Sequence, residues 1–273
     1  MRMRFKDGKR KVLTLSYDDG FVQDIRMVEV LNKYGIKATF NINSGMFLKE
    51  DAERKVFDGK LKLSEALELY LPSGHEIAAH TVNHIYPRNV DKMELMYEIL
   101  EDRKALENNF NSFVRGFAHP FSIYNEEIRG ILELGRYSYA RGGVSSYSFE
   151  LPENRFCLQP TCRHRDVRLM ELTEKFVNGN PRGELYFFLL MGHSHEFDGD
   201  NNWEVLEGFC DAVAGREDIW YATNIEIFDY IDAYDSLKIT SDSKIIHNPS
   251  VMDVWIEHKG KILRIPAGET VEV

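Results

Sequence analysis

The chain has 273 residues, of which 43% are hydrophobic and 29% are charged, the balance of an ordinary globular protein. Its formal net charge of -10 argues against nucleic acids and polyanionic glycans as partners, because no positive field is available to hold them. Neutral ligands are not excluded by this argument. No run of eighteen apolar residues occurs, so no membrane span is expected.

The start of the chain and the cysteines indicate a compartment. The first twenty residues include basic side chains but no separate apolar segment before the first strand, so they do not read as a signal peptide. Cys157, Cys162 and Cys210 form no CxxC motif and no disulfide framework, and we expect small buried residues. As the sequence stands, we expect a cytoplasmic protein. An exported or cell-envelope location would apply if the chain is a shortened form of an exported protein.

Strand-like and helix-like segments alternate through most of the chain. The predicted strands are 11–17, 36–42, 75–80, 113–119, 137–143, 155–161, 184–193 and 218–224. The predicted helices are 21–34, 64–71, 91–110, 125–135, 166–179, 201–215 and 225–234. Seven or eight strands alternating with helices indicate an α/β fold of parallel βα units, and their number suits a (β/α) barrel better than an open sheet.

The end of the chain has a different pattern. Residues 237–273 show short β alternation broken by Pro and Gly turns, which predicts a small antiparallel β appendage. The sequence therefore divides into a main domain at 1–236 and an appendage at 237–273.

Four predicted strands end in residues that can do chemistry. In chain order the strand ends deliver Asp18 and Asp19, then His80 and His84, then His119, Pro120 and Phe121, and finally His193 and His195. In a βα barrel the carboxyl ends of the strands meet at one face, where active sites form. We therefore expect these side chains to converge.

The segment "HTVNH" indicates a metal site. It places His80 and His84 four residues apart, on one side of a helical turn. Two histidines and one carboxylate, from Asp18 or Asp19, form a common set of ligands for a divalent metal and leave positions open for water and substrate. Such a metal lowers the pKa of water and polarises a carbonyl oxygen. The other aspartate could then act as general base, and a histidine from the strand end at 193–195 as general acid.

With these motifs in this order, residues 11–234 resemble the NodB-homology polysaccharide deacetylases (carbohydrate esterase family 4). "SYDDG", "HTVNH" and "LLMGH" match the Asp-Asp-Gly strand end, the H-[ST]-x-x-H motif and the leucine-rich strand ending in histidine. The family fold is a distorted, often incompletely closed β/α barrel. The resemblance implies one divalent metal, with zinc as the first choice and Co, Ni, Mn or Fe also tolerated. It implies these roles: Asp18 as general base, Asp19, His80 and His84 as metal ligands, and His193 as general acid.

The third motif departs from the family pattern. The family usually has Arg-Pro-Pro-Tyr, whereas this chain has "AHPFS", with Ala118 at the arginine position. Pro120 matches, and the backbone N–H of Phe121 can still serve as an oxyanion donor at the substrate. The family's arginine orients the catalytic base. Arg115, three residues earlier, is the replacement that we consider.

The fourth motif is blurred. In "PTCRHRD", Asp166 is our choice for the family's carboxylate that orients the acid histidine, with His164 as a nearby rival.

The resemblance implies a metal-dependent hydrolase that removes N-acetyl or O-acetyl groups from a carbohydrate, such as peptidoglycan or chitin-type N-acetylglucosamine units. Two alternatives stay open, a hydrolase of a small non-sugar amide and a catalytically impaired carbohydrate-binding relative. An oxygenase with two histidines and one carboxylate fits less well, because those ligands do not usually follow βα strands beside a second aspartate.

Overall fold

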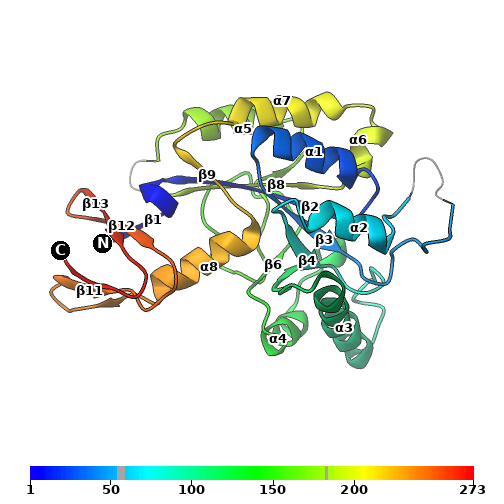
Figure 1. The fold of residues 1–273 in the computed structure, drawn as a ribbon, viewed down its shortest axis with the longest axis horizontal. Coiled ribbons are helices and arrows are strands. Elements are labelled where there is room, and N and C mark those ends of the chain that lie inside the picture. Colours follow the sequence, from blue (N-terminus) through cyan, green and yellow to red (C-terminus); the bar gives the residue numbers. More distant parts are fainter. Residues whose placement is uncertain (54–58, 182–183) are drawn as a thin grey trace.

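The computed structural model describes residues 1–53, 59–181 and 184–273 (Figure 1). Its strands are β1 Arg2–Arg4, β2 Lys11–Asp18, β3 Ala38–Ile42, β4 Glu76–Ala79, β5 Gly116–Ala118, β6 Tyr139–Arg141, β7 Cys162–Arg163, β8 Tyr186–Gly192, β9 Ile219–Tyr221, β10 Lys238–Ile239, β11 Ile245–His247, β12 Val254–His258, β13 Lys261–Ile265 and β14 Thr270–Glu272. Its α-helices are α1 Asp24–Tyr34, α2 Leu63–Tyr70, α3 Lys92–Phe110, α4 Glu126–Leu134, α5 Leu169–Asn178, α6 His195–Gly199, α7 Trp203–Val213 and α8 Asn224–Asp235. Two short 3-10 helices are η1 Lys6–Gly8 and η2 Pro120–Ser122.

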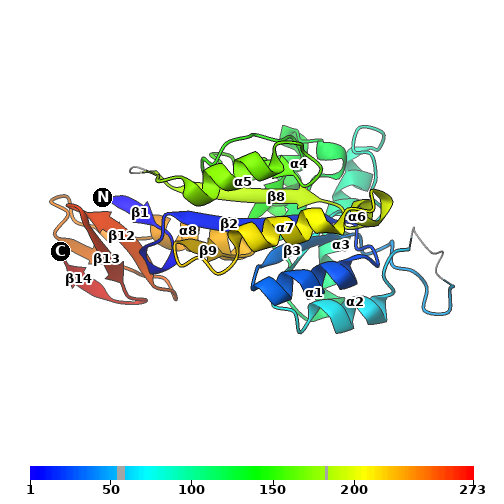
Figure 2. The ribbon, with the colours of Figure 1, turned by 90° about the horizontal axis from the view of Figure 1, so that it is seen from above.

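The main sheet is parallel and has the order β6-β5-β4-β3-β2-β8-β7, with β9 paired to the first half of β2. Strand β2 lies inside the sheet, between β3 and β8, and is buried at every position. Helices surround the sheet: α1 packs on α7, α7 on α5, and α3 on α4 (Figures 1 and 2). Because the sheet curls without closing regularly, the prediction of a distorted, incomplete (β/α) barrel is confirmed.

One irregular segment, residues 155–163, runs from β6 at one edge of the sheet to β8 near the other edge. The Leu158 N–H donates to the Ala140 carbonyl at 2.9 Å, so the segment pairs with β6. Its end forms β7, which pairs with β8. The prediction of a strand at 155–161 was therefore wrong in place, since the strand lies at Cys162–Arg163. Pro160 offers no N–H and cannot donate to a regular ladder there.

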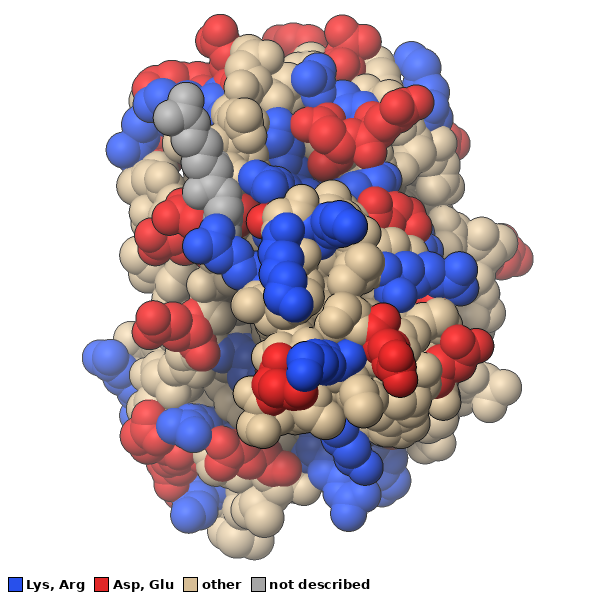
Figure 3. All heavy atoms as spheres, turned by 90° about the vertical axis from the view of Figure 1, so that its left-hand side faces the viewer, with Lys and Arg blue, Asp and Glu red and all other residues tan. Residues whose placement is uncertain are grey.

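The predicted C-terminal appendage is confirmed as antiparallel, but it includes the start of the chain. Strand β1 pairs with β12, which pairs with β13, and a second small sheet has the order β10-β11-β14. Both termini consequently lie at the same end of the molecule (Figure 1). The face of this end mixes acidic and basic side chains (Figure 3). The division at residue 236 stays a prediction.

Local signals set the helix boundaries that matter for the site. Helix α1 ends at Gly35, whose φ of 66° is readily adopted by glycine. Helix α3 begins after Asp91, whose carboxylate accepts the N–H groups of Met93 and Glu94 at 2.8 and 3.0 Å. Within the described residues, no helix combines the length and the apolarity that crossing a bilayer requires.

Candidate functional site

The predicted site residues lie at or after the carboxyl ends of four parallel strands of the main sheet. Asp18 ends β2, His80 follows β4, Phe121 follows β5 and His193 follows β8. Nε2 of His193 lies 3.9 Å from Oδ2 of Asp18 and 3.8 Å from Oδ2 of Asp19. The structure thus brings both aspartates and the histidine of "LLMGH" together.

A turn explains how two adjacent aspartates face one site. Strand geometry would direct their side chains to opposite faces. Asp19 leaves the strand with a φ of 82°, in the left-handed region, while its N–H donates to the Asn41 carbonyl at 2.8 Å. Gly20 follows with a φ of 63°. Such backbone is costly for a residue other than glycine and is often found at functional sites.

The two histidines of "HTVNH" and Asp19 form a set of possible metal ligands. One ligand atom from each of Asp19, His80 and His84 lies within 4.8 Å of the others. Nε2 of His84 is 3.8 Å from Oδ1 of Asp19. Metal ligands about 2.0–2.2 Å from a shared zinc ion lie three to four ångströms apart, so the set needs little adjustment to hold one ion.

The environment of His80 leaves one ring nitrogen for a metal. Nδ1 of His80 lies 2.8 Å from the Ala118 carbonyl oxygen, so it is protonated and donates, which leaves Nε2 without a proton. Burial lowers the pKa of His80 to about 4, although Asp18 and Asp19 act in the other direction. A neutral imidazole is the form that binds metals.

Asp18 is buried beside a guanidinium. Arg141 Nη2 and Asn41 Nδ2 both donate to Asp18 Oδ1, the second at 2.8 Å. Burial, the largest single effect, would raise the pKa of Asp18, but the charge and hydrogen bond of Arg141, together with His80 and His193, outweigh it and hold the pKa well below its ordinary value. Asp18 is therefore an ionised carboxylate whose other oxygen faces His193.

The guanidinium beside Asp18 belongs to Arg141, so the prediction that Arg115 takes this role was wrong. Arg115 precedes β5, at the amino end of the strand, where it forms a two-pronged ion pair with Asp229 of α8 at 2.6 and 2.8 Å. Arg141 ends β6 and pairs in register with Ala118 on β5. The arginine beside Asp18 therefore comes from β6, the neighbour of the strand β5 that carries the motif position Ala118. The strand was predicted at 137–143, whereas β6 ends at Arg141, so the rule of strand ends did not single this arginine out.

Glu196 is the carboxylate beside His193. Its Oε2 accepts the backbone N–H of His193 at 3.2 Å and lies 3.5 Å from the ring Nδ1. Burial would lower the pKa of His193, but Glu196, Asp18 and Asp19 together outweigh it and raise the pKa. Glu196 was not among the predicted site residues, although its place three residues after His193 is a local signal.

Asp166 has other partners, which corrects the choice made from the sequence. Its carboxylate accepts from the Tyr147 hydroxyl at 2.8 Å and pairs with Arg168 at 3.1 Å. The rival, His164, is buried, stacks on Phe197 with ring centres 4.1 Å apart, and lies 3.4 Å from Glu196. Glu196 therefore lies between two histidines.

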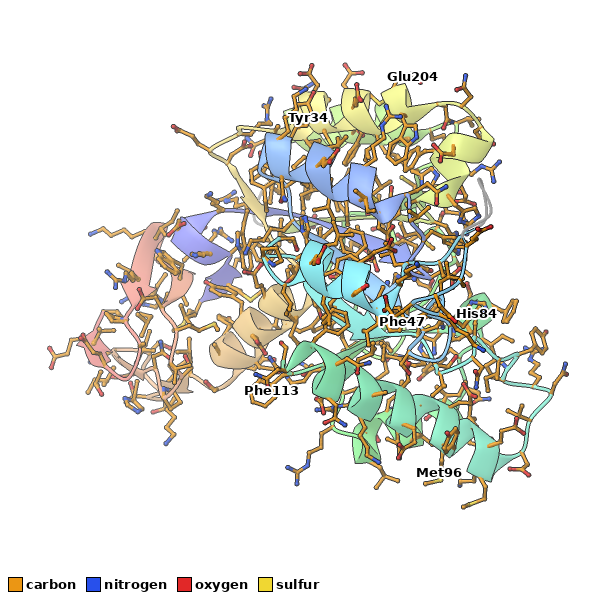
Figure 4. All side chains as sticks on the ribbon, turned by 45° about the vertical axis from the view of Figure 1, so that its right-hand side comes forward. Tyr34, Phe47, His84, Met96, Phe113 and Glu204 are labelled. Carbon is orange, nitrogen blue, oxygen red and sulfur yellow. The ribbon has the colours of Figure 1, made fainter. Side chains whose placement is uncertain are left out.

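Two further features complete the site. Lys60, which precedes α2, donates to the Asp19 carbonyl at 2.8 Å and lies 3.5 Å from its carboxylate. Phe121 has a φ of 54° and is 56% exposed, and its ring contacts His84 and Tyr86 with centres 4.7 and 5.2 Å apart. No pattern in the sequence indicated the contact of Lys60 with Asp19 or the ring contacts of Phe121. Figure 4 shows the labelled His84 near Phe47, on the side of the molecule opposite the appendage.

The family model described as "Polysaccharide deacetylase" matches residues 5–140. No protein in the curated set matches this chain. A candidate polysaccharide deacetylase from Mycobacterium smegmatis has 14% identity and a TM-score of 0.61, over 86% of this chain and 94% of the other.

Two further solved structures share the fold. A family 4 acetyl xylan esterase from Clostridium thermocellum, in complex with a cobalt ion, has 16% identity and a TM-score of 0.50, over 80% of this chain and 90% of the other. A Bacillus anthracis protein described as a CE4 family pseudoenzyme has 15% identity and a TM-score of 0.53, over 80% of this chain. The match spans 66% of that protein's chain, slightly less than two thirds.

Proposed function

The chain belongs to the polysaccharide deacetylase family with NodB homology, and we propose that it is a metal-dependent hydrolase that removes acetyl groups from a carbohydrate. One observation supports this most strongly. The possible metal-ligand atoms of Asp19, His80 and His84 lie within 4.8 Å of one another, and His193, whose pKa is raised, lies 3.8 Å from Asp19 and 3.9 Å from the ionised, buried Asp18. Metal-dependent hydrolysis of an amide or ester uses these components together.

Asp19, His80 and His84 are the proposed ligands of one divalent ion. Zinc is the first choice, and Co, Ni, Mn or Fe suit the same donors. A cobalt ion in the Clostridium thermocellum fold neighbour agrees with this range. When bound, such an ion would acidify water and polarise the acetyl carbonyl.

The remaining roles belong to side chains of the protein. Asp18 takes a proton from the attacking water, and Arg141 keeps Asp18 ionised and in place. His193, whose pKa is raised by Glu196 and the two aspartates, gives a proton to the departing amine or alkoxide. The N–H of Phe121 is the proposed oxyanion donor, and Pro120 fixes the start of the turn that carries it.

The exposed aromatic pair supports a sugar as substrate. Phe121 and Tyr86, 56% and 40% exposed, stand beside the proposed metal ligand His84. Aromatic rings with an exposed face can stack on pyranose rings through apolar contact. N-acetylglucosamine units of peptidoglycan or chitin type are therefore the leading substrates, with O-acetyl sugars as the second class.

The binding-only alternative is motivated by Ala118 at the arginine position and by the pseudoenzyme among the fold neighbours. Arg141 argues against it, because it supplies the guanidinium that Ala118 lacks. Hydrolysis of a small non-sugar amide uses the same side chains, so substrate tests separate it from the first proposal.

The test is acetate release by metal-loaded protein from chitin oligomers, peptidoglycan fragments, acetylated xylan and small amides. We expect turnover of acetylated sugars that is lost on chelation and restored by metal. Tyr86→Ala should raise KM for oligomers, while Tyr97→Ala, at an exposed tyrosine of α3, should not. A protein that binds metal but cleaves none of these compounds would disprove the proposed activity.

A further inference from the structure

Helix α3 contacts the metal-ligand loop, defined as residues 80–84, through two buried carboxylates. Oδ2 of Asp102 accepts the N–H of His80 at 2.8 Å, and Oε2 of Glu98 accepts the N–H of Asn83 at 2.8 Å. The two acidic residues are four positions apart, so they lie on one face of α3. Helix α3 thus fixes the distance between the two backbone N–H groups, of His80 and Asn83, at which it holds the loop. In Figure 4, α3 runs below the labelled His84.

The other oxygens of both carboxylates also accept from N–H groups. Oδ1 of Asp102 accepts the Ser44 N–H at 2.7 Å, and Oε1 of Glu98 accepts the side-chain amide of Asn83 at 2.6 Å. The backbone carbonyl of Glu98 takes a further bond from the Val82 N–H at 3.1 Å. Three backbone N–H groups of the metal-ligand loop therefore donate to groups on α3.

Burial makes these two carboxylates costly. Asp102 is 0% exposed and Glu98 is 3% exposed, and neither forms an ion pair with any residue that the structure describes. Burying a carboxylate without a cation is unfavourable unless hydrogen bonds satisfy it. An apolar residue at either position would avoid that cost but could not accept the loop's N–H groups.

The loop needs external support because its backbone is strained. Thr81 has a φ of 67° and His84 a φ of 50°, both in the left-handed region. That region is a genuine outlier for a β-branched residue such as threonine. The strained shape is what directs His80 and His84 toward Asp19.

We propose that Glu98 and Asp102 are positioning residues for the metal centre: they hold the metal-ligand loop in the shape in which both imidazoles reach one ion. The inference rests on the proposed metal site but not on the identity of the substrate. Neither carboxylate is itself a ligand, so each acts through the backbone of the loop.

Asp102→Asn and Glu98→Gln test the inference, because each keeps its shape while one accepting oxygen becomes an NH2 group. We expect metal affinity, measured by competition with a chelator, to fall about 10–100-fold in each variant, as for other partners of metal ligands. Amide hydrogen exchange at 80 and 83 should accelerate in the metal-free protein. Glu101→Gln is the matched control, since Glu101 lies on the same helix and, among the residues that the structure describes, pairs with Lys104 alone, at 3.0 Å.

The outcomes separate this inference from the proposed function. Folded variants that bind metal as tightly as the wild type would overturn the positioning role, even if their melting temperature falls, because a merely structural role predicts that result. Suppose that the wild type binds metal but releases no acetate, and that both variants bind metal more weakly. This result would support the positioning role and refute the deacetylase activity. If a variant fails to fold, Asp102→Glu and Glu98→Asp take its place in the metal-affinity measurement. Each retains the carboxylate but shifts it by one methylene group relative to the N–H groups of the loop.

Discussion

Arg141 donates a hydrogen bond to Asp18, and this buried ion pair joins the carboxyl ends of β6 and β2. Arg141 stands in register with Ala118, at the position where the family motif has its arginine. The same guanidinium therefore reaches the catalytic base from the neighbouring strand. Its other bonds, to Ser16 and to the Gly142 carbonyl at 3.1 and 2.6 Å, fix its plane.

Arg141→Lys should lower kcat by about 10²-fold or more, because an ammonium keeps the charge but cannot make the same set of bonds. The weaker partner lets burial raise the pKa of Asp18, so the acidic limb of the pH–rate profile should move to higher pH. Arg115→Lys, on the Asp229 pair, is the control and should leave the profile in place. The double variant Ala118→Arg with Arg141→Ala returns the arginine to its motif position and should recover part of the activity. Equal pH profiles for Arg141→Lys and the wild type would contradict this role.

Asp18→Asn should lower kcat by at least about 10²-fold, since it keeps the shape of the side chain but removes the base. Metal affinity should persist, because Asp19, His80 and His84 are unchanged. Titration with the metal and acetate-release kinetics on the same preparation check both points. Near-normal turnover with metal bound would exclude Asp18 as the base.

The part of the site that the sequence predicted depends on one geometric rule. Parallel strands expose their carboxyl ends at one edge, so Asp18, His80 and His193 could be grouped before any contact was known. The position of Arg141 follows instead from the pairing of β5 with β6, and that of Lys60 from its bridge to Phe21. Such contacts are tertiary and leave no local pattern.

The fold shows the same limit. Alternating βα patterns predicted the barrel, because each unit is local in sequence. The pairing of β1 with β12 joins Met3 to Ile256, and nothing in a three-residue strand announces a partner so distant. The misplaced strand at 155–161 reflects the same difficulty, since its pairing is divided between two edges of the sheet.

Glu196→Gln should move the basic limb of the pH–rate profile to lower pH. Glu196 is the main group that raises the pKa of His193 against the effect of burial, and a general acid must be protonated to act. Without the carboxylate, His193 loses its proton at lower pH and activity falls earlier as the pH rises. Asp166→Asn is the comparison, because Asp166 bonds to Tyr147 and Arg168. If Asp166→Asn shifted the basic limb and Glu196→Gln did not, Asp166 would be the carboxylate that acts on His193, and the assignment of Glu196 would be wrong.

Glu76→Gln should reduce the pH dependence of stability without touching the proposed site. Glu76 lies at the amino end of β4 and accepts from the Tyr139 hydroxyl and the Thr39 hydroxyl, each at 2.8 Å. Burial raises the pKa of Glu76 to about 7, despite those hydrogen bonds. The unfolded chain releases this proton at lower pH, so the stabilising contribution is complete below the ordinary pKa of glutamate and is lost as the pH rises through about 7.

The size of that effect follows from the shift. A difference of two to three pKa units corresponds to roughly 3 kcal/mol between pH 4 and pH 8. Burial also raises the pKa of Asp24 and Asp102 to about 7. The three carboxyl groups therefore all make the free energy of unfolding fall as the pH rises, and Glu76→Gln should remove only the contribution of Glu76. Urea unfolding of metal-free protein at pH 5 and pH 8 measures it, with Glu204→Gln as the control, because Glu204 lies exposed on α7 (Figure 4). If Glu76→Gln kept the full wild-type difference between the two pH values, the carboxyl group would not titrate on unfolding as its burial requires.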